Sequence, residues 1–212
     1  MNGSVKTPSA EEQSAREKIR AVLEPARFDL LERFVGALDQ WGAVSNLVSA
    51  ADRERIWARH IADSLQVVAL AEGRGRRWID LGAGAGFPGL VVAIARPETV
   101  MTLVESNRKK AAFLLRVVAD CGLDAKVEPH RAEALAADTY DVVSARALAP
   151  LHKLLALSEP FFGPDTLGLF PKGRDAGTEI EAVSDHRFDV TAHPSQTDPD
   201  GAVLAVTNLV RV

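Results

Sequence analysis

Hydrophobic residues recur every three or four positions through the first third of the chain. Phe28, Leu31 and Leu38 belong to this series. Such spacing places apolar side chains on one face of a helix. We therefore expect residues 11–72 to form an N-terminal helical extension, and we expect the polar residues 1–10 that precede it to be disordered.

Within this extension, a further helical pattern covers Ile56–Leu70. Asp52 precedes the pattern, and a carboxylate in such a place can accept hydrogen bonds from the free amides of a helix N-terminus. Gly73 and Gly75 then interrupt the periodicity. Because glycine commonly follows the end of a helix, the extension is expected to stop here and a second unit, residues 73–212, to begin.

From residue 77 onward, short apolar runs alternate with amphipathic stretches. The expected strands are 78–81, 100–105, 125–130, 140–144, 166–170, 188–192 and 203–210. The expected helices are 90–95, 107–121, 151–157 and 177–184. Repeated strand–helix units predict an α/β fold, a seven-stranded, mostly parallel sheet with helices on both faces. Because no helix separates the last two strands, one of them is expected to run antiparallel, as in Rossmann-like class I methyltransferases.

Length and composition indicate one soluble globular unit. The 212 residues are 47% hydrophobic and 25% charged. No apolar run approaches the roughly 18 residues that a membrane helix needs. A single cysteine, Cys121, allows no internal disulfide and no cysteine-rich metal site. We expect a monomeric cytoplasmic protein that binds no metal and no membrane.

The distribution of charge leaves nucleic-acid binding open. A net charge of −4 gives no overall basic field. However, residues 175–200 contain seven acidic side chains and one basic side chain, Arg187, so the rest of the chain is slightly basic. Basic clusters occur at Arg53–Arg59, Arg74–Arg77 and Arg108–Lys110. Each cluster is either a solvated face or a patch that contacts phosphates.

A glycine-rich loop follows the first expected strand. Residues 80–89 read Asp-Leu-Gly-Ala-Gly-Ala-Gly-Phe-Pro-Gly. Glycines allow the backbone to approach a ligand closely, and the next helix offers its N-terminal amides. Part of the loop, Gly84–Gly89, also matches the G-x-G-x-x-G pattern of dinucleotide sites, which is weak evidence alone.

Three features favour S-adenosylmethionine over a nicotinamide or flavin cofactor or a purely structural turn. Asp80 lies two positions before Gly82, the first of the glycines, where it can meet the methionine ammonium or an ordered water. Glu105 ends the second expected strand, where a carboxylate can accept both hydrogen bonds of a ribose diol. Residues 131–133 follow the third strand and can border the adenine. The sequence therefore predicts an S-adenosylmethionine site.

The absence of two catalytic motifs narrows the range of possible methyl acceptors. Enzymes that methylate exocyclic amines use an Asn/Asp-Pro-Pro-aromatic loop after the fourth strand, whereas residues 144–148 read Ser-Ala-Arg-Ala-Leu. Carbon-5 methylation of pyrimidines needs a cysteine nucleophile, and Cys121 is expected on a helix away from the active edge. Guanine N7 carries an exposed lone pair and needs no general base, so alignment and electrostatic fit suffice. Arg146 would hold a phosphate or guanine O6, or it pairs structurally with Glu133 or a backbone carbonyl.

The chain resembles a known family, the bacterial 16S rRNA guanine-N7 methyltransferases, also called glucose-inhibited division protein B (GidB) or methyltransferase G. The resemblance extends from about Trp41 to Gly173 and rests on four blocks in order. They are Asn46-Leu47 with Arg59-His60-Ile61-x-Asp63-Ser64-Leu65; the loop 80–89; Glu105–Lys110 with Phe113-Leu114; and Arg131–Glu133, Ser144–Ala147 and Lys172-Gly173.

The resemblance implies a function and a set of residues. The expected reaction moves a methyl group from S-adenosylmethionine to N7 of one guanosine, nucleotide 527 in the 530 loop of 16S rRNA, in the 30S subunit or an assembly intermediate. Arg146 and Lys172 are expected to position the acceptor, with no general base. The expected cofactor contacts are Asp80, Gly82, Gly84, Gly86, Phe87, Glu105, Ala132, Glu133 and Arg146. The expected RNA contacts are Arg59, His60, Arg108, Lys109, Lys110 and Lys172.

Several alternatives remain. His60 is either part of the site or a buried structural histidine, and Arg108–Lys110 is either an RNA contact or a solvated face. A methyltransferase with a small-molecule or protein acceptor would share the cofactor loop. A non-catalytic nucleotide-binding assembly factor would share the fold without turnover.

Overall fold

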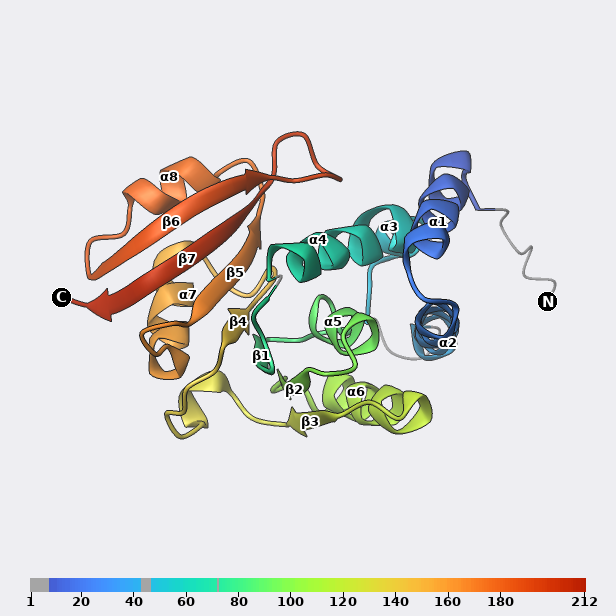
Figure 1. Cartoon of the computed structure of the whole chain (residues 1–212), viewed down its shortest axis with the longest axis horizontal. Coiled ribbons are helices and arrows are strands. Elements are labelled where there is room, and N and C mark those ends of the chain that lie inside the picture. Colours follow the sequence, from blue (N-terminus) through green and yellow to red (C-terminus); the bar gives the residue numbers. More distant parts are fainter. Residues whose placement is uncertain (1–7, 43–46, 72) are drawn as a thin grey trace.

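The computed structural model describes residues 8–42, 47–71 and 73–212 (Figure 1). Its strands are β1 (Arg77–Leu81), β2 (Val100–Val104), β3 (Ala125–Glu128), β4 (Val142–Ser144), β5 (Leu167–Lys172), β6 (His186–Pro194) and β7 (Ala202–Arg211). Its longer helices are α1 (Ala10–Val22), α2 (Pro25–Gly42), α4 (Ala62–Leu70), α5 (Gly89–Ala95), α6 (Arg108–Cys121), α7 (Leu151–Ser158) and α8 (Ala176–Glu181). Shorter turns of helix are α3 (Ala50–Arg53), the π-helix η1 (Ile56–Ile61), η2 (Ala132–Ala134) and η3 (Glu159–Phe161).

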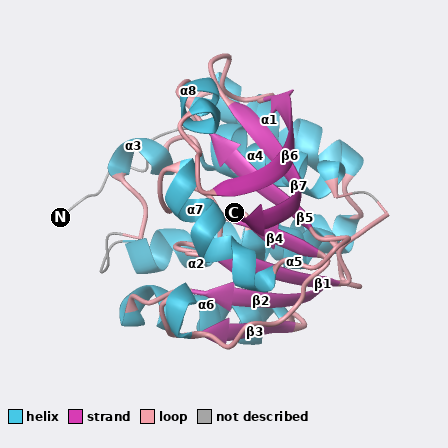
Figure 2. Ribbon diagram, turned by 90° about the vertical axis from the view of Figure 1, so that its left-hand side faces the viewer, coloured by secondary structure: helices cyan, strands magenta, loops and turns pink. Residues whose placement is uncertain are grey.

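Within the described residues, seven strands form one sheet in the order β3-β2-β1-β4-β5-β7-β6 (Figure 2). Strands β1 to β5 all run parallel to one another. Strand β7 runs antiparallel to both β5 and β6. The predicted seven-stranded, mostly parallel sheet with one reversed strand near the C-terminus is therefore confirmed.

Helices cover both faces of the sheet. One core packs α1, α2, η1, α4, α5 and α6 against strand residues such as Trp78 and Leu169. The other packs α7, η3 and α8 against residues such as Ile79 and Phe170. Neighbouring residues such as Trp78 and Ile79 enter opposite cores because side chains alternate along a strand. The first core also joins the N-terminal helices to the sheet.

The cap predicted for the helical stretch after residue 55 was wrong. Asp52 lies inside α3, and the Ser49 hydroxyl oxygen accepts the Asp52 amide at 3.1 Å. The amides of Trp57 and Ala58 at the start of η1 instead donate to the Glu12 carboxylate at 2.6 and 2.9 Å. Glu12 belongs to α1, so this buried cap joins two segments that lie 45 residues apart in the chain.

The β6–β7 turn reaches across to α4 and completes the surroundings of the site (Figure 1). The Gln66 side-chain amide donates to the Pro194 carbonyl oxygen at 2.7 Å, and its oxygen accepts the Gln196 amide at 3.0 Å. None of the helices in the described part of the chain combines the length and the hydrophobicity of a membrane-spanning segment. Residues 1–7, which were expected to be disordered, lie outside the described residues, and so does Asn46 of the first motif block. Ala10 was also expected to be disordered, but it already begins α1.

Candidate functional site: two adjoining cavities

A cavity of about 540 Å³ lies at the carboxyl ends of β1 and β2. This is the edge where open α/β sheets bind ligands. The glycine loop, the end of β2, the η2 turn and the loop after β4 form its walls. Among the residues predicted for the site, the lining includes His60, Gly82, Gly84, Phe87, Glu105, Lys110, Ala132, Glu133 and Arg146.

Asp80 lies behind the glycine loop, outside this lining. Its fully buried carboxylate accepts the Gly89 amide at 3.0 Å and the Ser144 hydroxyl at 2.7 Å. A Cβ at position 89 would lie 2.6 Å from the Asp80 carboxylate, so glycine is what allows this approach. The Ser144 oxygen also accepts Nε1–H of Trp78 at 2.9 Å. Asp80 thus ties β1, β4 and the start of α5 together and fixes the loop from behind.

Burial raises the pKa of Asp80 to about 7, although the hydrogen bonds from Ser144 and Gly89 and the charge of Arg146 oppose this shift. Gly86 also lies outside the lining. It has φ +98°, and a Cβ there would lie 2.4 Å from the Leu90 side chain. Asp80 and Gly86 therefore help to hold the loop in shape, and neither forms its ligand-facing surface.

Glu105 connects the glycine loop to the segment before α6. Its Oε2 accepts the Gly84 amide at 2.9 Å, and its Oε1 accepts the Asn107 amide at 2.7 Å. Each carboxylate oxygen can accept a second hydrogen bond. Because Glu105 also lines the cavity, it can hold the loop and a ligand hydroxyl at the same time.

The basic cluster Arg108–Lys110 forms the first turn of α6. Asn107 caps this helix, since its Oδ1 accepts the amides of Lys109 at 3.0 Å and Lys110 at 3.2 Å. Of the three basic side chains, Lys110 lines the cavity, whereas Arg108 and Lys109 lie outside the lining. Arg108–Lys110 was predicted as a single cluster, but the structure places Lys110 alone of its three side chains at the cavity.

A second cavity of about 410 Å³ lies at the carboxyl ends of β4 and β5. Arg146, Ala147 and Leu148 line both cavities and form the wall between them. Ala147 has φ +54°, an unfavourable conformation for a residue with a Cβ, and such strain is often found at functional sites. Other charged lining residues are Arg59, Asp63, Lys172, Glu179 and Asp198.

Lys172 extends along the wall of the second cavity. Its Nζ donates to the Glu179 carboxylate at 2.6 Å and to the Ala149 carbonyl oxygen at 2.9 Å. These contacts fix the ammonium group within the cavity. The structure thus brings Lys172 and Arg146 to one cavity, as the motif blocks suggest, and gives Lys172 a carboxylate partner, Glu179, that was not predicted.

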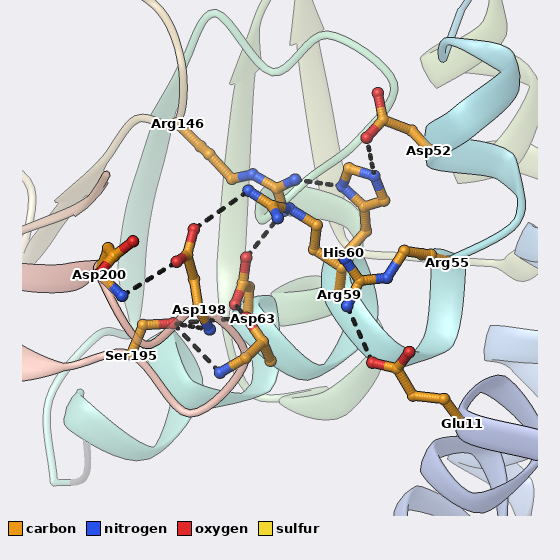
Figure 3. A network of polar contacts seen from close by, with 11 residues as sticks. Glu11, Asp52, Arg55, Arg59, His60, Asp63, Arg146, Ser195, Asp198 and Asp200 are labelled. Carbon is orange, nitrogen blue, oxygen red and sulfur yellow. Dashed lines mark hydrogen bonds and ion pairs between the residues drawn. The ribbon is translucent and has the colours of Figure 1, made fainter. Parts of the chain in front are cut away.

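Arg146 lies between the two cavities, and Figure 3 shows its contacts with His60 and Asp63. Its guanidinium donates to Nδ1 of His60 and lies 3.8 Å from the Asp63 carboxylate. It also lies over the Phe87 ring, 5.8 Å from the centroid. The structural alternative of a pair with Glu133 is therefore wrong, and the charged partner is Asp63. Burial lowers the pKa of Arg146, while Asp63 opposes that shift.

His60 is a buried neighbour of Arg146. Its ring stacks on Phe87 with 5.0 Å between centroids, and its Nε2 lies 3.3 Å from the Asp52 carboxylate. Burial and the charge of Arg146 lower the pKa of His60 to about 4. The ring is therefore neutral near pH 7, with Nδ1 accepting from Arg146 and the proton on Nε2.

Glu179 and Asp198 line the second cavity but were not among the predicted site residues. Both come from the acidic segment 175–200, for which no role was predicted. Asp198 lies 3.5 Å from Arg59, although 139 residues separate them in the chain. The sequence did contain a signal for this pairing, because the acidic segment 175–200 and the basic cluster Arg53–Arg59 carry opposite charges.

The sequence of residues 27–197 matches the family described as "GidB: rRNA small subunit methyltransferase G". The chain is 45% identical over 188 residues to the ribosomal RNA small subunit methyltransferase G of Methylorubrum extorquens strain PA1, covering 86% of this chain and 89% of that protein. The protein of that name from Parvibaculum lavamentivorans is 46% identical over 187 residues, covering 85% and 83%. That from Rhizorhabdus wittichii is 42% identical over 205 residues, covering 95% and 94%.

Solved structures with low sequence identity share the fold. One is M. jannaschii TYW2 in complex with AdoMet, with a TM-score of 0.56 and 12% identity over 72% of this chain and 76% of that chain. Another is the mitomycin 7-O-methyltransferase MmcR, with a TM-score of 0.56 and 15% identity over 96% and 73%. At these identities the likeness shows the Rossmann-like fold alone.

Proposed function

This chain belongs to the rRNA small subunit methyltransferase G (GidB) family, and from that premise we propose that it methylates N7 of guanosine 527 in 16S rRNA. The methyl donor is S-adenosylmethionine. One observation carries the proposal: a cofactor-sized cavity and a second cavity share a wall that includes Arg146. A donor and an acceptor bound in the two cavities would meet at that wall.

The first cavity fits S-adenosylmethionine. Its volume of about 540 Å³ is within the usual range for small-molecule sites. Gly82 and Gly84 leave the loop surface open, and Glu105 retains acceptor capacity for the ribose diol. Ala132 and Glu133 would border the adenine. Asp80 and Gly86 would contribute by holding the loop in shape.

The acceptor chemistry requires positioning rather than proton transfer. S-adenosylmethionine supplies a methyl group on a positively charged sulfur, so the guanine N7 lone pair forms the new bond while the C–S electron pair remains on sulfur. No proton leaves N7, so no general base is needed. Arg146 would direct a guanidinium N–H toward guanine O6, and Lys172 would hold the acceptor from within the second cavity.

The RNA would approach over the basic residues around the two openings. Arg59 and Lys172 line the second cavity, and Lys110 lines the first. Arg108 and Lys109 would contact phosphates outside the cavities, and His60 would act through Arg146. In this arrangement residues 11–72 contribute RNA contacts, and residues 73–212 bind the cofactor. The protein would act as a monomer in the cytoplasm, on the 30S subunit or an assembly intermediate.

Transfer of tritium from methyl-labelled S-adenosylmethionine tests this function. The substrates are 16S rRNA and 30S subunits from cells that lack the modification, beside fully modified subunits as the control. We expect label in the unmodified 16S rRNA and none in the control. Label found only in protein or in a small molecule would support the alternative acceptors. Cofactor binding without turnover would support the non-catalytic assembly factor.

A further inference from the structure

Arg59 and Asp198 form a pair (Figure 3), and this pair lies at the second cavity. Arg59 belongs to η1, and Asp198 belongs to the β6–β7 turn. Their closest atoms, Nη2 and Oδ2, are 3.5 Å apart, and both side chains line the cavity. The side chains are 38% and 31% exposed, so solvent and a large ligand can both reach the pair.

The turn itself fixes the place of Asp198. The Ser195 hydroxyl oxygen accepts the amides of Thr197 and Asp198, each at 3.2 Å. Oδ1 of Asp198 accepts the Asp200 amide at 3.1 Å, which leaves Oδ2 directed at Arg59. The carboxylate is therefore presented by a folded turn rather than by a freely moving chain.

Other contacts attach this turn to the helical extension. Gln66 bonds to the backbone of Pro194 and Gln196, and the Thr197 hydroxyl donates to the Asp63 carboxylate. None of these contacts uses the Asp198 side chain. The Arg59–Asp198 pair is thus not needed to hold the turn in place.

The pair is also weak. Partly exposed ion pairs contribute little because solvent screens them, and 3.5 Å is long for a charge-assisted hydrogen bond. A phosphate group offers Arg59 several oxygens and a two-pronged geometry that a single distant carboxylate oxygen does not provide. A phosphodiester at this cavity can therefore replace Asp198.

We propose that Arg59 is the binding site for an RNA backbone phosphate and that Asp198 occupies this site as its competitor while RNA is absent. The inference rests on the proposed function, because it assumes that an RNA acceptor enters the second cavity. This competition gives Asp198, a member of the acidic segment 175–200, a role. Asp198 lowers the affinity of Arg59 for any RNA phosphate, so RNA molecules other than the substrate occupy the site less often.

Two substitutions in the same turn test the competition. Asp198→Asn and Asp200→Asn each remove one negative charge, but only Asp198 pairs with Arg59. The probe is a 16S rRNA fragment that contains the 530 loop, with affinity measured by filter binding at low salt. We expect Asp198→Asn to tighten binding about fivefold and Asp200→Asn to tighten it less than about twofold. In an Arg59→Ala background the two substitutions should have equal effects.

Equal tightening by both substitutions in the wild-type background would overturn the proposal, because it would reflect only the general field of the turn. Weaker binding by Asp198→Asn would overturn it too, since Asp198 would then contact the RNA or maintain the cavity. Asp198→Ser, which keeps an oxygen for the Asp200 amide, serves if the first variant does not fold. A wild-type protein that binds this RNA but methylates neither the fragment nor unmodified 30S subunits would contradict the proposed function alone.

Discussion

The guanidinium of Arg146 donates a hydrogen bond to Nδ1 of His60, although the two residues lie 86 positions apart in the chain. Arg146 follows β4, and His60 lies in the π-helix η1 of the N-terminal extension. The bond requires a neutral imidazole, which burial provides by lowering the pKa of His60 to about 4. The extension therefore orients the arginine that separates the two cavities.

Replacing Arg146 by alanine should lower the rate of methyl transfer by about 100-fold, because a donor at the junction of the two cavities is lost. The thermal unfolding temperature should change much less. Rates are measured with saturating cofactor, and folding is followed by circular dichroism. Arg76→Ala, an exposed arginine outside both cavity linings, is the control. Parallel losses of activity and folded protein would identify Arg146 as a structural residue.

His60 should make the protein less stable in mild acid. Its pKa is about 4 in the folded protein against 6.5 ordinarily, so between these values the unfolded chain binds a proton that the folded protein does not. The free energy of unfolding should therefore fall by about 2 kcal/mol, from this group, between pH 7 and pH 5.

His60→Gln keeps an oxygen acceptor for Arg146 but does not titrate, so it should lack this loss in urea unfolding at the two pH values. The opposite contribution of Asp80, whose pKa is raised, is present in both proteins and cancels from the difference. An identical decrease in wild type and variant would show that His60 is not the group responsible.

Gly84→Val should weaken S-adenosylmethionine binding by at least about 30-fold, because the new side chain would enter the cavity wall at a positive φ. Gly84 has φ +57° and lines the first cavity. Gly73→Val is a matched control, since Gly73 has φ +76° and lies outside the lining. Isothermal titration calorimetry gives both affinities. Unchanged binding by Gly84→Val would mean that the cofactor binds elsewhere.

Glu105→Gln should lower the affinity for S-adenosylmethionine about tenfold, because an amide accepts fewer hydrogen bonds than a carboxylate. If the lost contacts are to the ribose, an analogue without the two ribose hydroxyls should bind wild type and variant within about twofold. Glu128→Gln, at the end of β3 and outside the lining, is the control. Equal losses for cofactor and analogue would assign Glu105 a role in the loop only.

The fold could be predicted because its signals are local. The alternation of apolar runs and amphipathic stretches after residue 77 gave every strand of the sheet, with ends that differ by a few residues. The cofactor loop could be predicted equally well, since its glycines and the following helix are contiguous in the chain. Family motifs then added Arg146 and Lys172, which the sheet brings to one cavity.

Long-range contacts could not be predicted in the same way. Glu12 caps η1 from 45 residues away, and Asp198 meets Arg59 from 139 residues away. Asp80 illustrates a different limit. A carboxylate before a glycine loop suits either direct ligand contact or support of the loop, and only its burial against Gly89 distinguishes the two.

Mapping of the methylated nucleotide shows whether the protein modifies N7 of guanosine 527. Unmodified 30S subunits are incubated with the protein and S-adenosylmethionine, the 16S rRNA is digested, and the fragments are sequenced by mass spectrometry. We predict one added methyl group, on N7 of guanosine 527, which the Arg146→Ala variant adds far more slowly. A methyl group on another nucleotide, on another atom of that guanosine, or on no RNA at all would contradict the account.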